Sequence, residues 1–183
     1  MITTKLRILM VEGAKEDAEL IKLHLQKIIE NFELKIVDNL ENTTQALQDF
    51  IPDVVLSDYD LPTCTGLDIL HITKETDESI PFIFITGSIE DEAVAENTIL
   101  AGTSGYVLKK HMDSLSEKLK PLLKRVAFEM FEKVELRDQI RKNKIAVNQI
   151  YSYIDDMASD NQEQKKNIYK IRKNIEHIKR KED

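Results

Sequence analysis

The sequence has little of what would mark a secreted or membrane protein. Its single cysteine, Cys64, cannot form an intramolecular disulfide and is typical of a reducing compartment. No apolar run approaches the roughly 18 residues that a membrane span requires. The apolar run at residues 8–11 is too short for a secretory signal. We therefore expect a cytoplasmic protein with no membrane association.

Helix breakers are missing from the last third of the chain, because all five glycines and all four prolines lie at or before Pro121. Charge changes in the same region. Residues 1–125 hold 13 basic and 22 acidic residues, whereas residues 126–183 hold 13 basic and 11 acidic residues. The acidic first part lacks the clustered Lys and Arg that phosphate contacts need, which argues against direct nucleic-acid binding. The pattern predicts a globular domain over 1–125 and a helical extension over 126–183.

The first part alternates short apolar runs with stretches of helical spacing. The apolar runs are rich in β-branched residues and predict buried parallel strands at residues 7–12, 34–38, 53–58, 81–86 and 105–109. Helical spacing occurs at residues 15–31, 42–50, 66–75 and 90–100, and a last helix is expected to begin near residue 113. Five strand–helix repeats predict an α/β fold, a doubly wound five-stranded parallel sheet with helices on both faces.

Polar residues end four of the predicted strands: Glu12, Asp58, Thr86 and Lys109. In an open parallel sheet, ligands bind beyond the carboxyl ends of the strands, where the strand order reverses. Two carboxylates, a hydroxyl and an ammonium in one crevice can hold a divalent cation and a phosphoryl group. Each residue alone has an ordinary explanation as a turn, a cap or a solvated side chain. The four together predict a site that handles phosphate.

Residues 5–125 contain the stretches ILMVEGAKEDAELI, PDVVLSDYDLPTCTGLDIL, IPFIFITGSIEDEAVAENTILAG and GYVLKK. Taken together, these stretches resemble the receiver domain of two-component response regulators. The resemblance implies a flavodoxin-like strand order 2-1-3-4-5 and Mg²⁺-dependent phosphoryl transfer from a histidine kinase or phosphotransfer protein to Asp58. It also implies that Thr86 and Lys109 stabilise the phosphoryl group and that Thr86 and Tyr106 form the switch.

The metal site implied by this resemblance departs from the family's pattern. Glu12, Asp58 and the backbone carbonyl of Asp60 would hold Mg²⁺, yet Gly13 stands where receivers usually carry a second acid. Losing a carboxylate lowers the charge of a site for a hard cation and weakens binding. Three outcomes are open: Glu12 reaches the metal, water fills the gap and Mg²⁺ binds weakly, or the domain is a pseudo-receiver that takes no phosphate.

The helical extension has the heptad spacing of a coiled coil, because its apolar residues recur at alternating steps of four and three. The residues of this predicted oligomer seam are Ile140, Val147, Ile150, Ile154, Met157, Asn161, Ile168, Ile171, Ile175 and Ile178. Asn161 at an a position favours a dimer, whereas Ile at d positions favours higher order. We expect a homodimer through one continuous helix; a helical hairpin that bends at residues 158–161 is the alternative.

These expectations combine into a signalling protein that is not an enzyme. The leading hypothesis is a response regulator that accepts a phosphoryl group on Asp58 and signals through oligomerisation or protein–protein contacts. One alternative is a phosphorylation-incompetent pseudo-receiver that acts as an interaction scaffold. The other is the N-terminal part of a longer sensor kinase.

Overall fold

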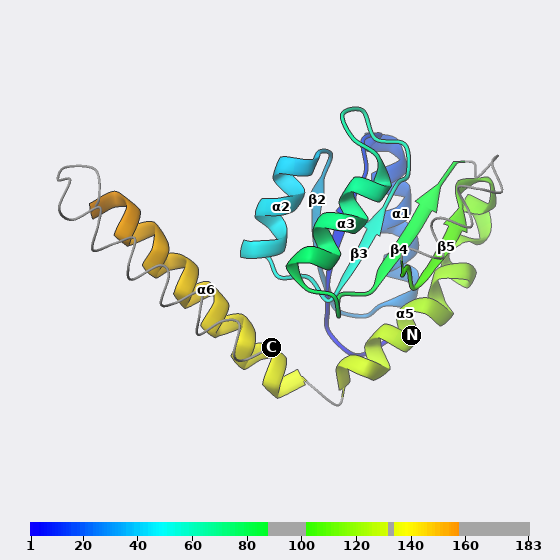
Figure 1. Ribbon diagram of the computed structural model, residues 1–183. Coiled ribbons are helices and arrows are strands. Elements are labelled where there is room, and N and C mark those ends of the chain that lie inside the picture. Colours follow the sequence, from blue (N-terminus) through cyan, green and yellow to red (C-terminus); the bar gives the residue numbers. More distant parts are fainter. Residues whose placement is uncertain (88–101, 132–133, 158–183) are drawn as a thin grey trace. The chain divides into compact units, whose positions relative to one another are not determined.

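A computed structural model describes residues 1–87, 102–131 and 134–157 of the chain (Figure 1). The chain divides into two compact units, Met1–Leu136 and Arg137–Asp183. The first unit contains a five-stranded, all-parallel sheet with the order β2-β1-β3-β4-β5. This order confirms the predicted α/β topology. The helix predicted at residues 90–100 lies outside the described residues.

The structure forms all five predicted strands. They are β1 (Leu6–Val11), β2 (Phe32–Val37), β3 (Val54–Ser57), β4 (Phe82–Thr86) and β5 (Gly105–Leu108). The helices are α1 (Lys15–Ile28), α2 (Leu40–Asp49), α3 (Gly66–Thr76), the 3-10 helix η1 (Lys109–Ser114), α5 (Leu115–Phe131) and α6 (Val134–Met157).

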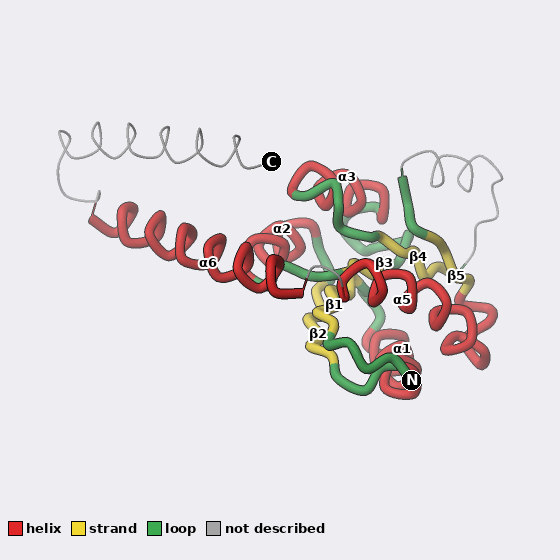
Figure 2. Tube along the Cα trace, turned by 90° about the horizontal axis from the view of Figure 1, so that it is seen from below, coloured by secondary structure: helices red, strands yellow, loops and turns green. Residues whose placement is uncertain are grey.

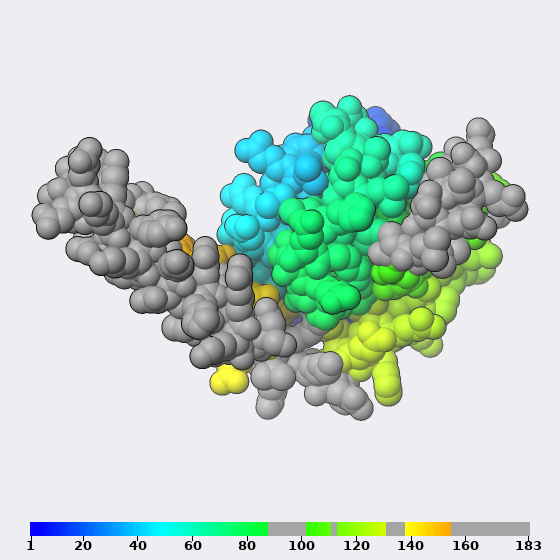
Figure 3. Space-filling view, viewed as in Figure 1, coloured from blue at the N-terminus to red at the C-terminus, as the bar shows by residue number. Residues whose placement is uncertain are grey.

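The central strands are buried on both faces because helices cover both sides of the sheet. Successive side chains of a strand point to opposite faces. Accordingly, Ile8 and Met10 of β1 pack in one apolar cluster with α1 and α5, while Leu9 and Val11 pack in a second cluster with α2 and α3. Figure 2 shows these two pairs of helices on opposite sides of the strands. In Figure 3, α2 and α3 form the cyan and green surface turned toward the viewer.

The first unit extends past the predicted domain boundary at residue 125. Val126, Ala127 and Met130 are buried in the apolar cluster that α5 shares with α1 and the sheet. The compact unit then ends at Leu136. The apolar face of α5 therefore continues to pack on the core after Arg125.

Helix α6 forms the described part of the extension. Two residues of the predicted oligomer seam, Ile140 and Ile150, are 42% and 48% exposed on it. The seam residues from Asn161 onward and the alternative bend at residues 158–161 lie outside the described residues. None of the helices in the ranges given above is both long enough and apolar enough to cross a membrane.

Candidate functional site

Strands β1 and β3 end side by side at one edge of the sheet. Val11 pairs with Ser57 in the parallel register, so Glu12 and Asp58, the next residues along the chain, leave the sheet as neighbours. The backbone N–H of Asp58 donates to the Val11 carbonyl at 2.9 Å. The strand pairing therefore brings the two predicted carboxylates together.

Strands β4 and β5 end at the same edge. Thr86 pairs with Leu108, so Lys109 follows the sheet directly beside the end of β4. The Lys109 ammonium donates a hydrogen bond to Asp58 Oδ2 at 2.7 Å. Its nitrogen also lies 2.7 Å from Glu12 Oε2. The structure thus joins three of the four residues predicted at the strand ends by direct contact.

Both oxygens of the Asp58 carboxylate are held in place. Oδ1 accepts the backbone N–H of Tyr59 at 2.7 Å and, at a longer 3.4 Å, that of Asp60. Oδ2 accepts from Lys109. The side chain is 10% exposed, so the group is fixed yet open to a small reactant. Asp60 itself lies exposed in the loop that follows.

Glu12 is the most buried acid of the site, with 2% of its side chain exposed. Its Oε1 accepts the backbone N–H of Ala14 at 3.0 Å, immediately before α1 begins. Its Oε2 is buried and forms an ion pair with Lys109 by distance, but the contact does not have hydrogen-bond geometry. A buried carboxylate oxygen with an incomplete set of partners is suited to accept a further cation or donor.

Asp17 belongs to the site and was not predicted from the sequence. It lies in the first turn of α1, and its Oδ2 accepts a hydrogen bond from Lys109 at 2.6 Å. Its side chain is 35% exposed. The available signal was its position, because α1 starts at the edge where β1 ends.

One ammonium therefore balances three carboxylates, those of Glu12, Asp17 and Asp58. Burial by itself would lower the pKa of Lys109, but its hydrogen bonds to Asp17 and Asp58 and its ion pair with Glu12 outweigh burial and raise the pKa above its usual range. Lys109 is thus firmly protonated at neutral pH. The four groups carry a formal net charge of −2, which favours a divalent cation.

Gly13 occupies a position with no room for a side chain. A Cβ atom there would lie 2.7 Å from Cδ and 2.9 Å from Cγ of Pro62, closer than real Cβ contacts allow. The proline ring has little freedom to yield. The acid that receivers usually carry at this position is therefore excluded as long as the loop between β3 and α3 keeps its path.

Gly66, the first residue of α3, packs against the backbone of the site. A Cβ atom there would lie 2.5 Å from both the Asp58 carbonyl oxygen and Cε1 of Phe84. Its backbone N–H also donates to the Tyr59 carbonyl at 2.7 Å. Gly66 therefore allows α3 to begin in close contact with the backbone of the site.

Thr86 and Tyr106 differ in exposure. Thr86 is fully buried, and its Oγ1 has no hydrogen-bond partner within the described parts of the chain. Such an unpaired hydroxyl costs about 1–3 kcal/mol, so a partner that enters the site would recover stability. Tyr106 is 45% exposed on β5, three residues before Lys109. The Thr86 hydroxyl is thus buried at the end of β4, whereas the Tyr106 side chain is partly exposed.

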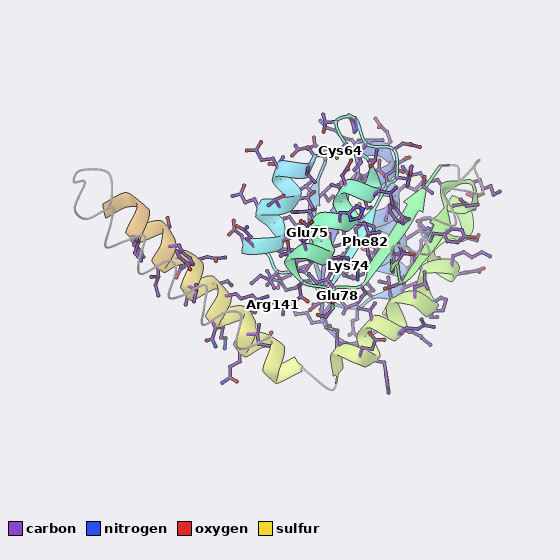
Figure 4. The ribbon with its side chains drawn as sticks, in the orientation of Figure 1. Cys64, Lys74, Glu75, Glu78, Phe82 and Arg141 are labelled. Atoms are coloured by element: carbon purple, nitrogen blue, oxygen red, sulfur yellow. The ribbon has the colours of Figure 1, made fainter. Side chains whose placement is uncertain are left out.

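The far end of α3 holds a structural lysine. Lys74 Nζ donates to the carbonyls of Glu78 at 3.0 Å and Ile80 at 2.8 Å, which closes the C-terminal end of the helix. Burial is the main influence and lowers the pKa of Lys74. Figure 4 shows Lys74 and Glu78 at the opposite end of α3 from Cys64, which lies in the loop near the site. Lys74 therefore does not contribute to the site.

The oxygen ligands at the edge suit a hard cation such as Mg²⁺, which one or two carboxylates and several waters commonly bind. Within the residues that the structure describes, no three His, Cys, Asp or Glu side chains are arranged to hold a metal ion. The acids here contact the Lys109 nitrogen instead. The donor set fits Mg²⁺, with Glu12 and Asp58 as the residues that would hold it.

Comparisons with known proteins agree with this geometry. The family model of the response regulator receiver domain matches residues 8–120. The luminescence regulatory protein LuxO of Vibrio campbellii is 31% identical over 102 residues, which are 55% of this chain and 21% of LuxO. The chain thus spans about a fifth of that relative's length. The chain belongs to the response regulator receiver domain family of two-component signalling.

Solved structures agree on the fold. A signal receiver domain from Vibrio parahaemolyticus superposes with a TM-score of 0.61 at 24% identity, covering 70% of this chain and 98% of that one. The receiver domain of a sensor histidine kinase from Pseudomonas aeruginosa, which has Mg²⁺ coordinated in its active-site cleft, gives a TM-score of 0.57 at 20% identity. It covers 67% of this chain and 98% of that domain.

Proposed function

We propose that this chain is a phosphoacceptor in two-component signalling and that Asp58 receives the phosphoryl group. The observation that carries the proposal is the contact between the anchored Asp58 carboxylate and Lys109 at 2.7 Å. The Thr86 hydroxyl at the same edge, which has no partner among the described residues, supports it. As a signalling acceptor rather than an enzyme, the chain would take the group from a histidine kinase or a phosphotransfer protein.

The chemistry is a phosphoryl transfer between nitrogen and oxygen. A carboxylate oxygen of Asp58 forms a bond to phosphorus while the N–P bond of the phosphohistidine breaks, and the imidazole leaves with the bonding electron pair and gains a proton from water. Lys109 is already protonated and neutralises the phosphoryl oxygens, and Thr86 donates its hydroxyl to one of them. Mg²⁺ bound by Glu12, Asp58 and the Asp60 carbonyl would reduce charge repulsion during the attack.

The proposed output begins at Thr86. When its hydroxyl moves to the phosphoryl group, it vacates space beside β5, and the ring of Tyr106 turns inward from its exposed position. The surface of β5 and α5 changes as a result. We propose that this change is transmitted to protein partners, and that the chain forms a homodimer through the oligomer seam that includes Ile140, Ile150 and Ile154.

The direct test is phosphorylation of the whole chain with acetyl phosphate and Mg²⁺, read by intact-protein mass spectrometry. We expect the mass of one phosphoryl group to be added to the native chain and to be absent from Asp58→Asn. Asp60→Asn is the matched control, because it changes an exposed acid two residues away and leaves its backbone carbonyl in place. A native chain that never gains the group would favour the scaffold alternative and overturn the proposal.

A further inference from the structure

The acid missing at position 13 cannot be restored locally. Pro62 occupies the space where a side chain on Gly13 would begin: its Cδ lies 2.7 Å from the position that a Cβ atom of residue 13 would take. Any compensating negative charge at the site must therefore come from another element. The strand-end acids that contact Lys109 in the described structure are Glu12 and Asp58.

Helix α1 provides such a charge through Asp17. Its Oδ2 lies 2.6 Å from the Lys109 nitrogen, and Asp58 Oδ2 and Glu12 Oε2 each lie 2.7 Å from the same atom. The three carboxylate oxygens are thus within two hydrogen-bond lengths of one another. Asp17 comes from a helix turn that no strand-end pattern includes, and it contacts the same Lys109 nitrogen.

Asp17 is also the acid best able to change its partner. Its side chain is 35% exposed, against 10% for Asp58 and 2% for Glu12, so its carboxylate can exchange Lys109 for water or a hydrated cation at the lowest desolvation cost. Glu12 and Asp58 are additionally anchored by backbone N–H groups. The site formed by Lys109, Glu12 and Asp58 has a formal charge of −1, and Asp17 makes it −2.

We propose that Asp17 replaces the acid that Gly13 lacks, so that Mg²⁺ binding to the site depends on the Asp17 carboxylate. The inference rests on the proposed function, because it concerns the cation of the same site. Ligand charge is a main determinant of affinity for hard cations, especially for an ion that keeps several of its waters. Asp17 acts on the ion either directly or through such a water.

Metal binding can be measured apart from phosphorylation. Mn²⁺ prefers the same oxygen ligands as Mg²⁺, and electron paramagnetic resonance counts the free ion, with Mg²⁺ added as the competitor. We expect Asp17→Asn to weaken the Kd of the whole chain for both ions by about tenfold. Asp17→Glu should retain most of the affinity because it keeps the charge. Glu16→Gln is the matched control, since Glu16 is an exposed acid of the same turn.

A second set of variants tests the replacement itself. In the Asp17→Asn background, Gly13→Asp combined with Pro62→Ala should recover most of the lost affinity, whereas Gly13→Asp alone should not, because Pro62 blocks the side chain. Circular dichroism checks that each variant is folded. Equal Kd values for the native chain and folded Asp17→Asn would overturn the inference.

The two proposals fail in different ways. If the native chain binds no metal ion, or binds it no more tightly than Asp58→Asn does, the phosphoacceptor function itself loses its support. If the native chain binds the ion and accepts the phosphoryl group while Asp17→Asn does both equally well, only the role of Asp17 is refuted.

Discussion

At the scale of single residues, Lys109 is, among the described residues, the one ammonium that contacts the three carboxylates of the site. Its removal would leave Glu12 and Asp58 buried without a counter-ion. We expect Lys109→Met to lower the free energy of unfolding by about 2–3 kcal/mol, less than for a fully buried pair because Asp17 is partly exposed. Lys110→Met, at an exposed neighbour, should have little effect in the same urea titration. Equal midpoints for the two variants would contradict the expectation.

The pH dependence of this contribution follows from the direction of the pKa shift. The folded-state pKa of Lys109 is raised above the unfolded value of about 10.4, so its stabilisation is complete below that pH. It is lost only as the pH rises through the folded-state pKa. The deficit of Lys109→Met relative to the native chain should therefore be constant between about pH 7 and pH 9.

At the scale of elements, the start of α3 depends on a reciprocal cap. The Thr65 side chain accepts the backbone N–H of Asp68 at 3.3 Å, while Asp68 Oδ2 accepts the backbone N–H and the hydroxyl of Thr65, each at 2.8 Å. We expect Thr65→Ala to lower the free energy of unfolding by about 1 kcal/mol, measured by thermal unfolding. The exposed acid Glu75, near the other end of α3, is the control: Glu75→Ala should not lower Tm.

The same cap has a predictable response to acid. The backbone N–H of Thr65 and then its hydroxyl lower the pKa of Asp68. The stability that Asp68 contributes is therefore present above its unfolded pKa of about 3.9 and is lost as the pH falls through the lower folded value. The difference in Tm between the native chain and Asp68→Ala should accordingly shrink below about pH 4.

The elements themselves were largely predictable, because buried parallel strands form continuous apolar runs that glycine, proline and charged residues interrupt. Glu12, Asp58 and Lys109 could be placed at one edge because strand ends align in a parallel sheet. Asp17 could not, since its approach depends on how α1 is rotated against the sheet. The contact of Pro62 with Gly13 depends on the path of a loop, which local sequence does not determine.

Composition also does not reveal where α5 stops contacting the core. The loss of helix breakers after Pro121 gives a continuous helical pattern through Val126 and Met130, but it does not reveal which turns still contact the core. That depends on the length of the sheet face that α5 covers.

At the scale of the whole molecule, the oligomer seam is testable through α6. We expect Ile150→Gln combined with Ile154→Gln to shift the chain from dimer to monomer in analytical ultracentrifugation, because the change places amides at a and d positions. Ile145→Gln is the matched control, since it makes the same change outside the seam. A monomeric native chain, or dissociation caused by Ile145→Gln alone, would refute the assigned seam.

Three carboxylates around one ammonium also have a consequence for how salt acts on the reaction. Residues 1–125 carry nine more acidic than basic residues, so small anionic donors such as acetyl phosphate approach against a repulsive field. Dissolved ions screen that repulsion and should speed the uptake from such donors. A protein donor with a basic docking surface would instead be drawn in, and the same ions would slow it. Ionic strength would thus separate the two kinds of donor by the opposite sign of their rate response.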